Sequence, residues 1–132
     1  MKQLTIETTA QQQFVEITKQ VEKVVKTTGM TAGVVHLFIP HTTAGITINE
    51  NCDPDVCSDM LDILEKAVPT HGEYRHQEGN SHSHAKASLM GNHTTVIVVG
   101  GRMVLGTWQG IFLAEFDGPR SRTVLVKPQP DS

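Results

Sequence analysis

The sequence has few of the residues that mark disulfide-rich or membrane proteins. Its 132 residues include only two cysteines, Cys52 and Cys57, and they are not spaced as Cys-x-x-Cys. Two such cysteines are too few for a disulfide framework, so we expect both to be reduced and structural. The longest apolar runs are 34–39, interrupted by His36, and 96–99. Neither approaches the length of a membrane span, and the N-terminus lacks a signal-peptide pattern, so we expect a cytoplasmic protein without a membrane partner.

Strong charge of either sign is also missing. The net charge is −3 with neutral histidines, and no basic stripe is visible. This argues against a nucleic-acid partner. Hydrophobic residues make up 38% and charged residues 19%, which is typical of globular proteins. A chain of this length fits one domain, residues 1–132, and can bury roughly two-thirds of the surface that its unfolded chain exposes.

The pattern of apolar residues predicts strands interspersed with helices. Apolar alternation or β-branched content indicates strands at 4–8, 14–17, 34–39, 44–48, 96–99, 111–116 and 123–126. Gly100-Gly101 suits a two-residue hairpin turn. With at least one hairpin and no strict strand–helix alternation, we expect an α+β fold. It would have mixed or antiparallel β-sheet layers with two main helices packed on them.

Two helices are predicted from helical spacing and from their end signals. The first covers 17–28, with Thr18 as a possible N-cap and Gly29 as the stop. The second follows Asp53 as N-cap and Pro54 at the first helical position, and Pro69 ends it. Five apolar residues of the second helix predict a buried stripe: Val56, Met60, Ile63, Leu64 and Ala67.

The segment 70–84 is almost wholly polar and is predicted to be a long loop, followed by a short helix at 85–90. Long polar loops in compact domains are often functional. Four of the chain's seven histidines lie in this loop; the seven are His36, His41, His71, His76, His82, His84 and His93.

These histidines indicate a candidate metal site. Imidazole is the commonest protein metal ligand, and three converging rings would suit zinc or a related divalent ion, with a position left for water or substrate. No named metal signature is present. His82 and His84 would project to one side only on an extended segment and would diverge on a helix. The alternative for any single histidine is a solvated loop residue.

Glu115 is the most informative carboxylate because it lies within an apolar strand, on the same face as Ile111 and Leu113. A carboxylate there lies at an exposed edge, or is buried and paired with a metal or an arginine. Arg120 and Arg122 follow closely, and they either bind a phosphate or pair with Glu115.

Further polar residues follow two other strands. Thr42 and Thr43 come after Pro40-His41, where hydroxyls could meet an anion. Asn49 and Glu50 open an oxygen-rich run, in which Glu50 is a candidate base or metal ligand. The lone Trp108, with Gln109, lies between two glycines, a pattern that favours a close backbone approach or a bulge. The Trp108 ring could stack on a flat ring. The alternative for Trp108 is a packed aromatic.

Three motifs together resemble the YjbQ-like family. The first is Pro40-His41-Thr42-Thr43-Ala44, continuing through Ile46-Thr47-Ile48-Asn49-Glu50-Asn51 to Asp53-Pro54. The second comprises Tyr74-x-His76, Glu78-Gly79-Asn80 and Ser83-His84-x-Lys86-x-Ser88. The third is Gly106-Thr107-Trp108-Gln109-Gly110-Ile111, followed by Glu115 and Asp117-Gly118-Pro119-Arg120. The resemblance covers about residues 3–126.

The resemblance implies a homotrimer with a polar site near the subunit contacts. It also implies a possible secondary thiamine-phosphate synthase activity, in which a pyrimidine diphosphate is coupled to a thiazole phosphate. The matched histidines, His41, His76 and His84, are then the expected ligands of a divalent metal ion (zinc, or magnesium or manganese); His82 matches a more variable position. The expected catalytic residues are Glu115, Glu50 and Asn49. The residues expected to bind a phosphorylated or heterocyclic substrate are Trp108, Gln109, Arg120, Lys86 and Thr42.

Two alternatives to a metal-dependent enzyme stay open. One is a non-catalytic trimer that binds a small molecule, an anion or a metal. The other is a structural or interaction protein whose histidines face solvent.

Overall fold

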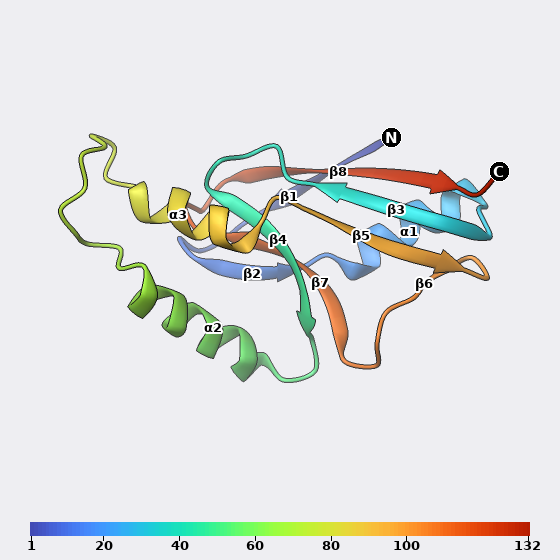
Figure 1. Cartoon of the computed structure of the whole chain (residues 1–132), viewed down its shortest axis with the longest axis horizontal. Helices are drawn as coiled ribbons and strands as arrows, with labels where there is room; N and C mark the ends of the chain where they lie inside the picture. The colour runs from blue at the N-terminus through green and yellow to red at the C-terminus, as the bar shows by residue number, and fades with distance from the viewer.

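The structure, a computed structural model, describes residues 1–132 and contains two antiparallel sheets and three helices (Figure 1). The larger sheet has the strand order β1-β8-β3-β5-β6. Its strands are β1 (Lys2–Glu7), β8 (Ser121–Pro130), β3 (Ala32–Phe38), β5 (His93–Val99) and β6 (Arg102–Met103). The smaller sheet has the order β2-β7-β4, with β2 (Gln13–Glu16), β7 (Gln109–Glu115) and β4 (Ala44–Glu50).

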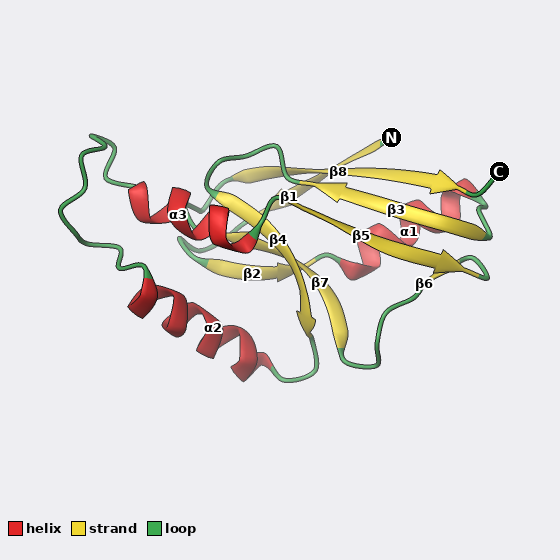
Figure 2. Cartoon of the chain, viewed as in Figure 1, coloured by secondary structure: helices red, strands yellow, loops and turns green.

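This architecture confirms the predicted α+β fold with antiparallel sheet layers, as Figure 2 shows. The core combines inward residues of both sheets with the stripe Val21, Val24 and Val25 of α1 (Thr18–Thr28). In β7 and the residue that follows it, Ile111, Leu113 and Glu115 alternate with Phe112, Ala114 and Phe116, so the two sets lie on opposite faces of the smaller sheet. The first set faces the main core, and the second faces the other two helices.

The hairpin between β5 and β6 turns at Gly100-Gly101, as predicted, with φ values of 61° and 76°. Both values lie in the left-handed region that glycine adopts without steric cost. No helix in the structure has both the length and the apolar character needed to cross a membrane.

The predicted N-cap role of Thr18 is wrong, because the hydroxyl is used elsewhere. Ile17 occupies the cap position, and no side chain caps the helix. The Thr18 hydroxyl donates to Glu16 Oε2 at 2.8 Å and accepts from the Ile111 amide at 2.8 Å. Thr18 therefore joins the start of α1 to β2 and β7.

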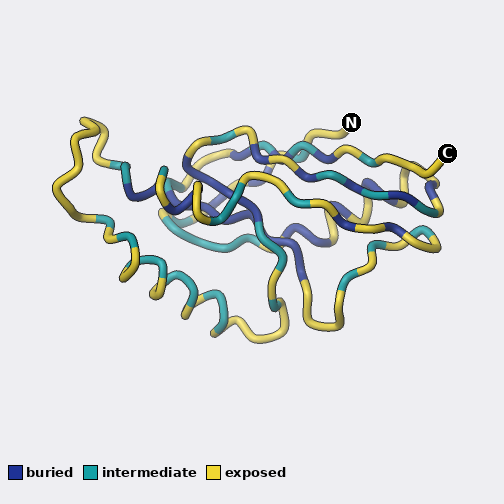
Figure 3. Tube along the Cα trace, in the orientation of Figure 1, coloured by how far each residue is buried: buried dark blue, intermediate teal, exposed yellow.

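The second helix, α2 (Pro54–Ala67), begins as predicted, but it is not buried as predicted. Asp53 Oδ1 accepts from the Asp55 amide at 2.9 Å, and Pro54 is the first helical residue. No residue of α2 is buried, however, and Ile63 is 62% exposed. The helix lies outside the smaller sheet and packs on β2, so only one flank of it is half-covered (Figure 3).

The third helix, α3 (Ser81–Met90), begins four residues before the predicted start at Ala85. Residues 81–84, which were predicted to belong to the polar loop, are therefore helical. Because successive helical residues point about 100° apart, His82 and His84 diverge. His82 is buried, and His84 lies on the outer side.

Candidate functional site

The connection between β3 and β4 is held against β8 by two consecutive residues. The Thr123 amide donates to His41 Nε2 at 2.9 Å. The Arg122 guanidinium donates through Nη2 to Thr43 Oγ1 at 2.8 Å and to the Thr43 carbonyl at 3.2 Å. Thr42, between the two anchored residues, is left exposed. The His-Thr-Thr motif thus consists of two anchors with a free hydroxyl between them.

Arg122 is in turn fixed by Glu115, and both side chains are buried. Arg122 Nε donates to Glu115 Oε1 at 2.8 Å, and Arg122 Nη2 donates to Oε2. The Thr8 hydroxyl and the Asp117 amide add bonds of 2.8 and 3.0 Å to the same carboxylate. Burial alone would raise the pKa of Glu115, but these donors outweigh it and hold the pKa below its ordinary value.

Glu115, expected from the family resemblance to be catalytic, is therefore a deprotonated anchor whose two oxygens both accept hydrogen bonds. Its strand position predicted either an exposed edge or a buried carboxylate paired with a metal or an arginine, and the structure shows the buried arginine pair. The carboxylate positions Arg122, and Arg122 positions the loop that carries His41.

The second wall of the site is α3, which lies close to β4. A Cβ at Gly45 would come within 2.6 Å of the Gly91 carbonyl, so only glycine allows this approach. The Ile46 amide donates to that carbonyl at 3.0 Å and fixes the end of the helix. His84, Ala87 and Ser88 follow at helical spacing and form one face.

Between these two walls lies a surface hollow of about 510 Å³, which we call the His41 hollow. Its lining residues come from the β3–β4 connection, the start of β4, and the outer face and end of α3: His41, Thr42, Ala44, His84, Ala87, Ser88, Gly91 and Asn92. Burial and the positive charge of Arg122 hold the pKa of His41 below its ordinary value. Two imidazoles, two hydroxyls and an amide can bind a small polar molecule there.

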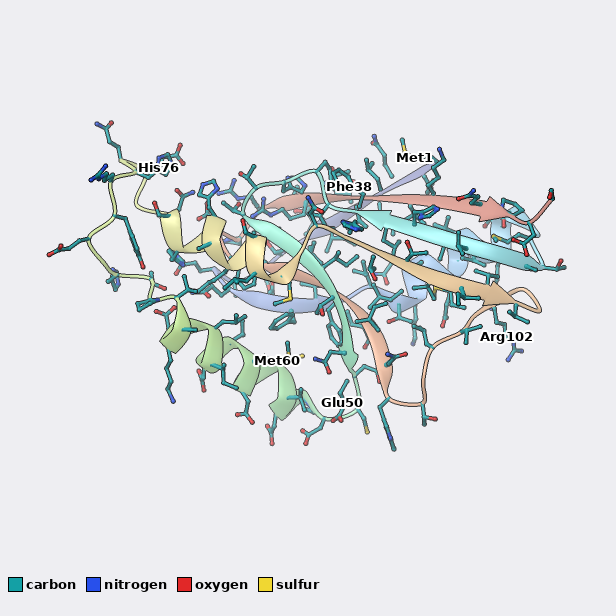
Figure 4. All side chains as sticks on the ribbon, in the orientation of Figure 1. Met1, Phe38, Glu50, Met60, His76 and Arg102 are labelled. Carbon is teal, nitrogen blue, oxygen red and sulfur yellow. The ribbon has the colours of Figure 1, made fainter.

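The three histidines predicted to hold a metal do not converge within one chain. His41 and His84 line the hollow, but His76 lies on the loop before α3, at the left of Figure 4. The His76 ring meets the His84 ring edge-on, with centroids 5.6 Å apart, and His76 Nε2 is 4.0 Å from Glu78 Oε1. No three His, Cys, Asp or Glu side chains lie close enough together to hold a metal ion. The residues of a single chain therefore do not fit the predicted metal.

Lys86, predicted to bind substrate, is on the inner side of α3 and is 0% exposed. Its ammonium donates to Gln12 Oε1 at 3.1 Å, Glu65 Oε1 at 2.9 Å and His82 Nδ1 at 3.0 Å. All three of its protons are used, so Lys86 has no free donor for a ligand. Burial and the Lys86 charge lower the pKa of His82. This cluster ties α3 to α2.

The remaining predicted residues form a separate group at the other end of β4. Glu50 pairs with Gln109 there, whereas Ala44 pairs with Glu115 at the end near the hollow. Six residue steps separate the two ends, which is about 20 Å along a strand. Trp108 is 59% exposed at the far end, and Glu50 is labelled there in Figure 4.

Hydrogen bonds within the chain occupy two of these residues. Gln109 Oε1 accepts from the Gly106 amide at 2.8 Å, and Asn49 Oδ1 accepts from the Glu50 amide at 2.7 Å. A Cβ at Gly110 would lie 2.6 Å from Glu16 Oε2, which confirms the close approach predicted near Trp108. Within one chain, the structure does not bring this group to the His41 hollow.

Arg120 lies near His41 and contributes to lowering its pKa. Its guanidinium donates to the Asp117 carbonyl at 2.8 Å and to Asp117 Oδ2 at 3.2 Å, and its side chain is half-exposed. Sequence reasoning missed Ser88 and Asn92 as lining residues. Positions 84, 88 and 92 follow helical spacing, but this alignment is visible only once α3 is known to start at Ser81.

Comparison with known proteins gives a consistent set of relatives. The family model described as "UPF0047 protein YjbQ-like" matches residues 2–131. The chain is 50% identical over 128 residues to UPF0047 protein YugU of Bacillus subtilis, covering 96% of this chain and 97% of YugU. The crystal structure of an uncharacterised YjbQ/UPF0047-family protein of Clostridium acetobutylicum superimposes with a TM-score of 0.96. It is 51% identical, and the match covers 98% of this chain and 100% of that one. The crystal structure of a YjbQ-like protein of unknown function from Sulfolobus solfataricus gives a TM-score of 0.94 at 32% identity. The match covers 98% of this chain and 96% of that one.

Proposed function

This chain belongs to the UPF0047 YjbQ-like family, and we propose that it binds a small polar molecule in the His41 hollow. One observation carries the proposal: the hollow joins His41 and Thr42 of one motif to His84 and Ser88 of another. These residues come from two elements whose close approach depends on Gly45. Concave sites with a few convergent polar groups are the usual form of small-molecule sites.

The chemistry of the hollow suits a ligand with hydrogen-bonding groups on several sides. The lining offers imidazole, hydroxyl and amide groups, while the nearby charges of Arg122 and Arg120 are paired with Glu115 and Asp117. A phosphorylated or heterocyclic molecule matches this mixture. The half-exposed Arg120, whose charge acts on His41, is the candidate partner for an anionic group that extends from the hollow.

A thermal-shift screen of phosphorylated sugars, nucleotides and heterocycles tests this proposal. A ligand that binds the folded state raises the melting temperature in a concentration-dependent way. His84→Ala should abolish the shift, whereas His71→Ala, the same change at an exposed loop position, should leave it intact. If the ligand still raised the melting temperature of His84→Ala, the ligand would bind outside the hollow.

In the finer form of this proposal, transfer chemistry takes place in the same hollow. The family resemblance suggests thiamine-phosphate synthesis as a secondary activity. His41 and His84 are the groups that could orient the reacting molecules. Lys86 is buried, and the group around Trp108 lies about 20 Å away, so one chain supplies no complete diphosphate cradle. Incubation with the pyrimidine diphosphate and the thiazole phosphate should yield thiamine phosphate, and His84→Ala should remove that yield.

We further propose that the protein acts as a cytoplasmic homotrimer in which a second copy completes the site. Support comes from large apolar side chains left exposed on the single chain, including Ile63 of α2 and Trp108. Sedimentation equilibrium should give three times the 14.5 kDa chain mass. A concentration-independent monomer would overturn the trimer without affecting the hollow.

A further inference from the structure

His41 occupies the place where β3 leaves the larger sheet. The ladder between β3 and β8 runs from Gly33↔Pro130 to Phe38↔Leu125 and stops there. Thr123, two residues beyond Leu125, would have no ladder partner on that side. Its amide donates instead to His41 Nε2 at 2.9 Å. The imidazole thus replaces a strand carbonyl as the acceptor for β8.

This hydrogen bond determines where the imidazole carries its proton. An amide N–H can only donate, so Nε2 must present a lone pair and carry no hydrogen. A neutral ring then holds its single proton on Nδ1. We infer that His41 serves the hollow as a hydrogen-bond donor through Nδ1–H and not as a metal ligand; the inference rests on the proposed function of the hollow.

Two consequences follow for the ligand. A metal ion could bind Nδ1 only by displacing the proton, and it could bind Nε2 only by breaking the Thr123 bond and leaving that amide without an acceptor. The ligand itself must direct an acceptor toward His41, such as a carbonyl or phosphate oxygen or an unprotonated ring nitrogen. His41 is therefore a specificity-determining residue that selects acceptors.

Nuclear magnetic resonance of the ¹⁵N-labelled full-length protein at neutral pH tests the proton position directly. Long-range ¹H–¹⁵N spectra should show a protonated Nδ1 and a bare Nε2 for His41, assigned by the loss of its signals in His41→Gln. A through-hydrogen-bond coupling should connect Nε2 to the Thr123 amide nitrogen. A proton on Nε2, or on both nitrogens, would overturn the inference.

Two substitutions separate the two nitrogens. In His41→Gln the side-chain oxygen can accept from the Thr123 amide, but the donor at the Nδ1 position is lost. In His41→Asn the side-chain amide can donate near the Nδ1 position, but the acceptor is lost. Because an unsatisfied donor is costly, His41→Asn should melt roughly 5 °C below His41→Gln. The opposite order would contradict the assignment.

Zinc alone provides the last test. Addition of Zn²⁺ up to several equivalents should leave the Nδ1–H resonance of His41 in place. Loss of that resonance with one equivalent bound would show coordination and overturn the inference. The spectra of the free protein and the zinc titration need no small-molecule ligand. Their outcome is therefore independent of the ligand screen and its His84→Ala control, and the proton assignment and the proposed function of the hollow can fail separately.

Discussion

Two buried cations in this protein are neutralised in different ways. Arg122 and Glu115 are both buried in the core, and the carboxylate accepts from the Thr8 hydroxyl and the Asp117 amide in addition to the Arg122 guanidinium. Lys86 is equally buried, but its partner Glu65 belongs to α2 and has a side chain that is 43% exposed. The first pair joins β7, β8 and the β3–β4 connection, whereas the second ties α3 to a helix with no buried residue.

This difference indicates where the protein is rigid. The Glu115–Arg122 pair is fixed by further hydrogen bonds from neighbouring residues, so it can hold the wall of the His41 hollow in one position. The Lys86–Glu65 pair is the main polar attachment of α2, together with Gln12 and Thr70, which bind the same carboxylate. We therefore expect α2 to be less stable than the sheets.

Removal of Arg122 should have the largest effect. Arg122→Ala leaves Glu115 buried and without its cation, and the loss of one partner of a buried pair costs about 3–5 kcal/mol of unfolding free energy. Urea denaturation followed by circular dichroism measures this cost. The double variant Glu115→Gln/Arg122→Met should be less destabilised than Arg122→Ala, because no charge is left buried. A single variant within about 1 kcal/mol of wild type would show that the pair is not a structural anchor.

Removal of Lys86 should cost less. Lys86→Met keeps a long side chain in the buried position, and Glu65 can turn to water because it is half-exposed. The remaining loss is the hydrogen bonds to Gln12 and His82, about 1 kcal/mol. The same urea experiment measures it. A loss equal to that of Arg122→Ala would remove the distinction between the two pairs.

Hydrogen exchange should show the contrast without any global unfolding. Amides of α2 should exchange faster than those of β7 and β8, because segments with little burial open locally. Lys86→Met should accelerate exchange in α2 by several-fold and leave the sheet amides unchanged. Equal protection of α2 and β7 in the wild-type protein would contradict a weakly held helix, or would show that another copy covers it.

Acid should produce the smallest effect at the α2 attachment, because Glu65 is half-exposed and water screens its charge. Hydrogen bonds from the Thr70 amide and hydroxyl, and from Lys86, lower the pKa of Glu65 from 4.5 to about 2. Since the folded pKa lies below the unfolded one, this contribution is complete above about pH 4.5 and disappears as the pH falls toward 2. The unfolding free energy of Glu65→Gln, measured by urea denaturation, should therefore fall less over this pH range than that of the wild type. An unchanged pH profile would mean that Glu65 is not held as a carboxylate.

Local sequence signals predicted most of the secondary structure, for physical reasons that act within a few residues. Apolar alternation located the strands, and the Asp53-Pro54 pair located the start of α2 because a carboxylate caps nearby amides. The start of α3 was wrong because its first turn, Ser81 to His84, is polar and has no side-chain cap, so nothing local distinguished it from the preceding loop.

The candidate site was only partly predictable. His41, Thr42 and His84 were identified and line one hollow. Lys86 was expected to bind substrate because its motif resembles the family and its charge suits a phosphate, whereas its burial against Gln12 and Glu65 depends on contacts between distant segments. The residues around Trp108 were predicted to belong to the same site, because their motif resembles the family as strongly as the histidine motifs do. The pairing of β4 with β7 places them at the opposite end.

The element types, the α+β class and the family follow from the sequence alone, because side-chain periodicity and end signals act locally and the motifs are specific. Tertiary contacts are needed to define which charges are buried, which helix stays exposed and which nitrogen of His41 is free. Each of those outcomes depends on a contact between distant segments, such as Thr123 with His41 or Glu65 with Lys86. Whether a charge is buried, or which tautomer a histidine adopts, depends on the residue that contacts it, and the fold determines which residue that is.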